Sequence, residues 1–184
     1  MSKRSVFCIA ESRGRADRIV HDLKEANFSS TDLSVLFLDG TASDGPASAA
    51  KPLTAKNVLT ARSAGEIRGV LGWIAGIRSL VIPGVGPLIG AGPVAAALSS
   101  VTLGGIAGGL LDFDVPQVEA SRYEGRIKDG CILISVHSEN PEKSDQARGI
   151  FTENEAENIC TLIEVSTPKI RLRNAAGSPR EFVA

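Results

Sequence analysis

The stretch Gly69–Leu111, GVLGWIAGIRSLVIPGVGPLIGAGPVAAALSSVTLGGIAGGLL, decides how this chain can fold. Arg78 is its only charged residue. Small water-soluble domains rarely expose so large a contiguous apolar surface. The stretch must therefore be buried by the domain itself, by a second copy of the chain or by a lipid bilayer. The sequence of this stretch does not show which of the three buries it. It also does not indicate a biochemical activity.

The sequence predicts a glycine-rich helical hairpin inserted over residues 63–111. The pattern Ser63-Ala-Gly-Glu66 fits a capping box, so a first helix is expected to begin there and to continue to about Val81. The run Ile82–Pro93 contains three prolines and four glycines, which favour a turn. A second helix is expected from the end of this run to Leu111, and each helix would measure roughly 28 Å.

Glycines recur at four-residue spacing along both predicted helices. Such spacing leaves a flat strip without side chains, along which two helix backbones can approach closely. Glycine inside a helix costs about 1 kcal/mol relative to alanine, so tight packing has to offset that cost. The helices are therefore expected to pack against each other or against copies of themselves. The candidate self-association residues are Gly65, Gly69, Gly72, Gly76, Gly104, Gly105, Gly108 and Gly109.

A lipid bilayer is the competing shelter for this segment. The predicted helices are close to the shortest length that spans a bilayer. The second is rich in small residues with few strongly apolar side chains, and Arg78 weakens the case for the first. Trp73 lies in the middle of the first helix rather than at an interface position. Burial by folding back or by self-association is therefore favoured, and membrane contact stays as a second hypothesis.

The flanking sequence is typical of an α+β domain. Two helices with apolar stripes are expected at Arg15–Asn27 and Pro141–Asn154, each between two strand-like runs. The order β-α-β, insertion, β-α-β predicts a ferredoxin-like split βαβ sandwich, with the hairpin inserted between strands 2 and 3. The four strand-like runs are Ser5–Ala10, Leu33–Leu38, Cys131–Val136 and Ile159–Val165.

These assignments divide the chain into four parts. Residues 1–38 and 112–165 together are expected to form the ferredoxin-like domain. Residues 39–62 are predicted to be a linker, because they are rich in glycine, alanine, serine and proline. Residues 63–111 form the apolar insertion, and residues 166–184 are expected to be a mobile tail.

The predicted strands are apolar on both faces. In the third strand Ile132 and Leu133 point to opposite faces, whereas a sheet with one wet face should alternate apolar and polar residues. The two sandwich helices can cover only one face. The second face is expected to be covered by the inserted segment, by a helix at Pro116–Lys128 with Asp114 as its N-cap, or by another subunit.

Composition argues against several classes of function. The net charge of −1 over 184 residues gives no general attraction to nucleic acid. The three cysteines form no CxxC pair, which leaves zinc and redox-motif sites without support. The first apolar run is too short for a signal peptide, so a cytoplasmic location is expected.

No catalytic, cofactor-binding or metal-binding residue is predicted. Gly84-Val-Gly86 and Gly90-Ala-Gly92 are interrupted by prolines and lack the acidic residue that a dinucleotide fingerprint requires. His21 and His137 are isolated, and each is expected to be a solvated surface side chain. Tyr123 is expected to pack with its hydroxyl at the edge of the domain.

The patterns GWIAG, IPGVGPLIGAGPVAAAL, GGIAGGL and VPxxxAxxYEGRIKDGCILISV resemble bacterial general stress proteins of the heat-induced and low-temperature-induced type. The likeness covers roughly Ser5–Val165 and is strongest from Gly69 to Val136. The resemblance implies a stress-associated protein of unknown biochemical activity, with no catalytic residues to carry over. The longer linker and the C-terminal tail depart from the family's pattern.

The leading hypothesis is a non-enzymatic, stress-associated protein that self-associates as a homo-oligomer through its apolar hairpin. One alternative is a membrane-anchored protein that uses the hairpin as its anchor. Another is a small-molecule-binding sensor or enzyme with a pocket beside the sheet, which is an argument from the fold alone.

Overall fold

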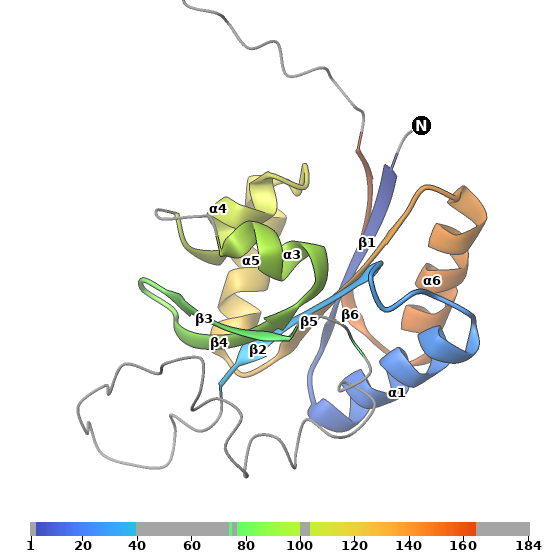
Figure 1. Cartoon of the computed structure of the whole chain (residues 1–184), viewed down its shortest axis with the longest axis horizontal. Helices are drawn as coiled ribbons and strands as arrows, with labels where there is room; N and C mark the ends of the chain where they lie inside the picture. Colours follow the sequence, from blue (N-terminus) through green and yellow to red (C-terminus); the bar gives the residue numbers. More distant parts are fainter. Residues whose placement is uncertain (1–2, 40–73, 75–76, 100–103, 165–184) are drawn as a thin grey trace, which may run out of the picture.

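The structure, a computed structural model, describes residues 3–39, 74, 77–99 and 104–164. Within them helices and strands are mixed along the chain (Figure 1). The elements are β1 (Lys3–Ala10), α1 (Arg13–Glu25), β2 (Leu33–Leu38), β3 (Arg78–Ile82), β4 (Gly86–Ala91), α3 (Gly92–Leu98), α4 (Gly105–Leu111), α5 (Gln117–Lys128), β5 (Ile132–Ser138), α6 (Pro141–Glu153) and β6 (Glu157–Glu164).

The strands of the described residues form one six-stranded antiparallel sheet in the order β3-β4-β2-β5-β1-β6. β1 lies inside the sheet, where Val6 is opposite Val136 of β5 and Thr161 of β6. On the other side of β5, β2 pairs with β4 and sets Phe37 opposite Ile89. The sheet is open, so β3 and β6 are its two edges.

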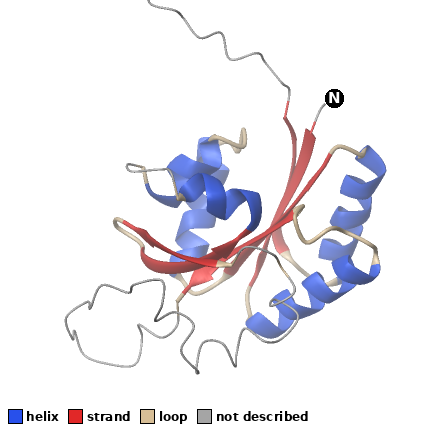
Figure 2. Ribbon diagram, viewed as in Figure 1, coloured by secondary structure: helices blue, strands red, loops and turns tan. Residues whose placement is uncertain are grey.

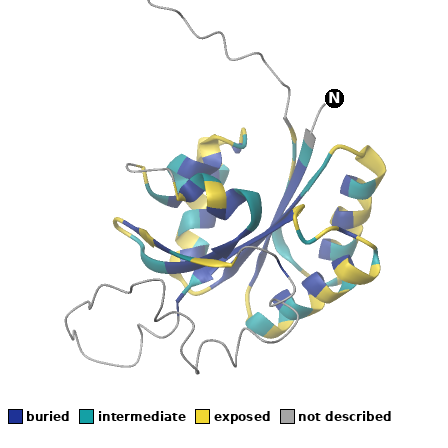
Figure 3. Cartoon of the chain, in the orientation of Figure 1, coloured by how far each residue is buried: buried dark blue, intermediate teal, exposed yellow. Residues whose placement is uncertain are grey.

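Helices cover both faces of this sheet, as Figure 2 shows. α1 and α6 pack on one face, where Ile19 and Phe151 are fully buried. α3, α4 and α5 pack on the other, where Leu110 and Tyr123 are fully buried. The prediction that both faces are covered is confirmed, and the cover on the second face comes from the inserted segment together with α5. The buried strands between the two layers are visible in Figure 3.

The two helices of the first layer begin at the residues that the sequence favours. The Ser12 hydroxyl accepts a hydrogen bond from Arg15 N–H and caps α1. The side chain of Asn140 accepts from Glu142 N–H at 2.9 Å and caps α6, with Pro141 in the first turn. Both predicted helices are confirmed, with bounds that shift by one or two residues.

The predicted helical hairpin is wrong over residues 78–91, which form the β-hairpin β3–β4. Pro83 and Gly84 occupy the corner of a tight turn, closed by a hydrogen bond of 3.1 Å from Val85 N–H to the Ile82 carbonyl. Gly84 has φ +82°, which suits the third position of a type II turn. β4 occupies part of the run Ile82–Pro93, for which the sequence predicts a turn. Pairing with β3 and β2 gives it hydrogen-bonded neighbours on both sides. The rest of the predicted first helix lies outside the described residues, apart from Ile74 and Ile77.

The predicted second helix is also corrected, because two short helices replace it. α3 begins at Gly92, next to Pro93 as expected, but ends at Leu98. α4 begins only after Gly104, whose φ of +107° cannot belong to a right-handed helix. Of the predicted linker, only Asp39 is described, and it is buried. Residues 166–184, the predicted tail, lie outside the described residues.

The helix α5 is confirmed, but its predicted cap is not. Asp114 has φ +58° and lies before the helix, while Pro116 holds the N-cap position. Gly130, with φ +92°, follows the C-terminal end of the helix, where a left-handed glycine commonly ends a helix. The helix carries Tyr123 and Ile127 on the face that packs on the sheet, where both are fully buried.

Candidate functional site

The described part of the glycine-rich segment is sheltered largely by its own domain. Leu88 of β4 and Val94 of α3 are at most 1% exposed, and Ile106 and Leu110 of α4 are fully buried. These side chains join one hydrophobic cluster with Phe7 of β1. These residues of the apolar segment are therefore buried by their own domain, and they need neither a second copy nor a bilayer to cover them.

Gly105 at the start of α4 leaves room for the carboxylate of Glu124 from α5. A Cβ atom on Gly105 would lie 2.8 Å from Oε2 of Glu124, which is closer than carbon and oxygen atoms approach. That same oxygen accepts a hydrogen bond of 2.9 Å from Ala107 N–H in the first turn of α4. The carboxylate therefore caps α4 from a neighbouring helix, where Nζ of Lys128 lies 2.7 Å from its other oxygen.

The charge state of Glu124 follows from these contacts. Burial works against the charged carboxylate, but the hydrogen bonds from Lys128 and Ala107 outweigh it and hold the pKa of Glu124 below its usual range. A negative charge at the N-terminal end of α4 also interacts favourably with the helix dipole. The contact is thus an internal clamp between α4 and α5.

Four of the predicted self-association glycines belong to this region. Gly109 is buried, Gly105 and Gly108 are partly buried, and Gly104 is exposed. The nearest atoms to a Cβ on Gly104 belong to Gly108 of the same chain. Their role in self-association stays a prediction. The other four, Gly65, Gly69, Gly72 and Gly76, lie outside the described residues.

The outward side of the segment is the edge strand β3. Val81 is 73% exposed, and Ile77, just before the strand, is 37% exposed. Leu80 and Ile82, which alternate with Val81, point into the core instead. The segment therefore buries one face of its hairpin and leaves apolar side chains at the sheet edge.

A second cluster is polar and lies at one end of the sheet, beneath α3. The Ser5 hydroxyl lies 2.9 Å from Nδ1 of His137. The Ser135 and Ser34 hydroxyls lie 3.0 Å and 3.3 Å from Nε2 of the same ring. Val94 N–H, in the first turn of α3, donates to the Ser34 hydroxyl at 3.1 Å. Strand register creates this cluster, because Ser5 is opposite His137 and Ser34 is opposite Ser135.

The expectation that His137 is a solvated surface side chain is corrected. The residue is partly buried, and its ring packs edge-on against Phe7 with 5.9 Å between ring centroids. Phe113 lies on another side at 5.3 Å. A sequence reading missed the cluster because its members come from three strands, and only their register brings them together. The alternation Ser135-Val136-His137 is the one local signal that two polar groups share a face.

A serine and a histidine in contact raise the possibility of a nucleophile and its base. Ser5 and Ser135 are 0% exposed and Ser34 is 2% exposed, so a substrate carbonyl has no route to their hydroxyls. The contacts instead satisfy polar groups that would otherwise be buried without partners. The cluster is therefore a structural polar network at the end of the sheet.

A hollow of about 450 Å³ lies beside this cluster. Its wall combines hydroxyl, carboxylate, amide and imidazole groups, which can exchange hydrogen bonds with a small polar molecule. It lies where the loop before β2, the start of α3 and the end of β5 meet. The lining residues are Thr31, Asp32, Pro93, His137, Ser138, Glu139 and Asn140.

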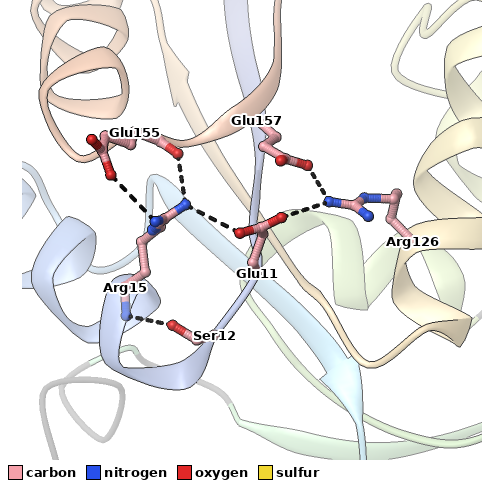
Figure 4. A network of polar contacts seen from close by, with 6 residues as sticks. All are labelled: Glu11, Ser12, Arg15, Arg126, Glu155 and Glu157. Carbon is pink, nitrogen blue, oxygen red and sulfur yellow. Dashed lines mark hydrogen bonds and ion pairs between the residues drawn. The ribbon is translucent and has the colours of Figure 1, made fainter.

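A network of charges closes the opposite end of β1 (Figure 4). Glu11 lies between two arginines, 3.5 Å from Arg15 of α1 and 3.4 Å from Arg126 of α5. Arg15 also reaches Glu155 at 3.3 Å, and Arg126 pairs with Glu157 of β6. The network joins the two helical layers, because Arg15 belongs to α1 and Arg126 to α5. Both arginines already have carboxylate partners, so neither is an unpaired cation that could bind an anionic ligand.

Burial favours the neutral forms of the three cysteine thiols and of the Tyr123 phenol. Burial raises the pKa of the Cys8 thiol, and it also raises the pKa of the Cys131 and Cys160 thiols. Burial likewise raises the pKa of Tyr123, whose hydroxyl donates to the Asn158 carbonyl at 2.7 Å. Tyr123 thus packs at full depth, with its hydroxyl bound to the edge strand β6.

The described residues hold no group of three or more histidine, cysteine or acidic side chains placed to bind a metal ion. The two glycine pairs that resemble part of a phosphate-binding loop are placed otherwise by the fold. Gly84, Gly86 and Gly90 lie in the β3–β4 hairpin, and Gly92 begins α3. The first-turn amide of Val94 there is already bound to Ser34. Of the helices that the structure describes, none combines the length and the apolarity needed to cross a bilayer.

Comparisons with protein-family models, with curated proteins and with solved structures found no match to this chain. Proposals about its function therefore rest on the geometry above and on the likeness noted in the sequence.

Proposed function

We propose that this chain is a non-enzymatic, stress-associated protein that self-associates through its glycine-rich apolar segment. The observation that carries the self-association is the exposure of Val81 and Ile77 at the edge of the sheet. The described part of the segment buries most of its apolar side chains in its own domain. Val81, Ile77 and Leu111 remain at the surface, and the first two lie at a strand edge. The association with stress is supported by the sequence resemblance alone.

Light scattering over a concentration series tests the self-association. The unmodified chain is expected to show a mass above that of the monomer, rising with concentration. Val81→Glu is expected to raise the dissociation constant at least tenfold, because it places a charge in the contact. Val118→Glu is a matched control, since Val118 of α5 is also 73% exposed and lies away from β3. A monomer at every concentration would refute the proposal.

We also propose that the four strands β2-β5-β1-β6, with α1 and α6, form a ferredoxin-like split βαβ unit. Their order in the sheet and the position of both helices on one face support this assignment. The segment between β2 and β5 would then be an insertion that extends the sheet by two strands. A cytoplasmic location completes the proposal, with membrane contact as the alternative that fractionation without detergent would separate from it.

The hollow beside His137 favours a second candidate, a sensor for a small polar molecule. Its volume of about 450 Å³ and its mixed polar wall support this candidate. A thermal-shift screen with small metabolites tests it, with Glu139→Leu as a variant that leaves the Asn140 cap of α6 in place and should abolish any shift. A shift that the variant retains would place the ligand elsewhere.

A further inference from the structure

We propose that a second copy of this chain pairs with the outer edge of β3, strand against strand, so that two six-stranded sheets become one across a two-fold axis. The inference rests on the proposed self-association and names its surface and geometry.

Pro87 shows which backbone groups of β3 face outward. Its carbonyl accepts a hydrogen bond of 3.0 Å from Asp39 N–H, so residue 87 directs its backbone toward β2. Pro87 lies opposite Val81 in the β3–β4 register. Val81 therefore directs its N–H and C=O away from β4, and so does Ser79, two residues earlier. In the part of the chain that the structure describes, no strand lies beyond β3 to receive these groups.

The side chains at this edge are suited to contact with another apolar surface. Val81 is exposed on one face of the strand, and Ile77 is exposed just before it. Arg78 is the only charged residue in β3. Edge strands that remain unpaired usually carry charges, prolines or bulges that block a partner, and β3 from Ser79 to Ile82 has none of these.

A two-fold axis at Leu80 allows the outward N–H and C=O groups of Ser79 and Val81 to form hydrogen bonds with the second copy. It sets Ser79 of each copy opposite the partner's Val81, so that all the outward N–H and C=O groups of both residues are bonded across the interface. It also sets Arg78 opposite the partner's Ile82, which keeps the two guanidinium groups at opposite ends of the contact. A parallel arrangement would place the two Arg78 side chains together, and like charges in that position repel.

Disulfide trapping with Leu80→Cys tests this geometry. At a non-hydrogen-bonded antiparallel pair the two Cα atoms lie about 4.5 Å apart, which is within reach of a disulfide. Mild oxidation is expected to give a cross-linked dimer at least tenfold faster than for Val118→Cys, a control on α5 whose side chain is more exposed than that of Leu80. The unmodified chain measures the background from its own cysteines, of which Cys8 and Cys131 are buried and Cys160 is partly buried.

Hydrogen exchange on the unmodified chain gives a second measurement that needs no substitution in the core. The amides of Ser79 and Val81 are expected to exchange at least tenfold more slowly above the dissociation constant than below it. A dimer by light scattering without either signal would overturn the strand pairing and leave self-association standing. A monomer throughout would refute both.

Discussion

The two edges of the sheet, β3 and β6, differ in how they meet solvent. β6 begins with Glu157, which is paired with Arg126, and Asn158 in the next position has φ +50°. Its register with β1 shifts once, between Phe7 and Ile9, so the strand is irregular near its start. β3 keeps an unbroken register with β4, and its most exposed apolar side chain is Val81.

This difference indicates which edge can accept another strand. Irregular backbone and charge interrupt the row of hydrogen-bonding groups that a new strand would need, and natural sheets use both to prevent pairing. β6 has both features, although Ile163 is 52% exposed there. The contrast teaches that apolar exposure alone does not mark a docking edge. A regular backbone with free donors and acceptors has to accompany it.

The largest effect is expected from Ser79→Pro, which would break the comparison by giving β3 the protection that it lacks. The Ser79 N–H faces outward, so proline removes a donor at the interface without removing a bond to β4. The dissociation constant measured by light scattering should rise by about a hundredfold or more, with a similar unfolding midpoint. An unchanged mass would show that the copies meet elsewhere.

A smaller effect is expected from Glu124→Gln, which separates the internal contacts of the glycine-rich segment from its edge. The folded pKa of Glu124 is lowered, so its carboxylate stabilises the fold above the unfolded pKa, and this contribution is lost as the pH falls through the folded pKa. The variant should be less stable by about 1 kcal/mol near neutral pH. The difference in unfolding free energy between the variant and the unmodified chain should become smaller below about pH 4.

Chemical denaturation at several pH values measures this difference, with light scattering on the same samples. The mass should not change, since α4 and α5 meet inside the monomer. A gap that stays constant down to pH 3 would mean that the ionised carboxylate is not what stabilises the contact.

The smallest effect is expected from Glu157→Gln on β6. The Glu157 and Arg126 side chains are 41% and 30% exposed, so solvent screens their interaction and its loss should cost less than about 1 kcal/mol. The irregular register of β6 remains in the variant, so no new association should follow. A mass larger than that of the unmodified chain would show that charge alone had protected this edge.

Much of the α+β framework could be predicted from periodicity. Ala16, Ile19, Val20 and Leu23 mark one face of α1, and all four are buried as their spacing indicates. The apolar strands required cover on both faces, and the structure supplies it. These predictions succeeded because the spacing of apolar residues within one helix or strand shows directly which of its faces is buried.

The β3–β4 hairpin could not be read in the same way. β4 is buried from Leu88 to Ala91, so its sequence has no alternation that would separate a strand from a helix. The glycine spacing that favoured helices lies on either side of this hairpin. Within it, Gly90 serves close packing, because a Cβ atom there would lie 2.8 Å from the Cβ of Ala95. The signal that could have found the hairpin is Pro83-Gly84 between apolar runs.

The polar cluster was out of reach for a different reason. Ser5, Ser34 and His137 are separated by many residues, and each looks ordinary in its own segment. Their meeting depends on two strand registers at once, which local sequence patterns do not specify.

The position of Glu11 has a consequence for how the molecule comes apart. Its carboxylate is shared by Arg15 of α1 and Arg126 of α5, which lie on opposite faces of the sheet. Detaching either layer there disturbs the charge balance of the other. The side chains of Arg15, Arg126 and Glu11 are 28%, 30% and 48% exposed, so this link should couple the unfolding of the two layers by no more than about 1 kcal/mol.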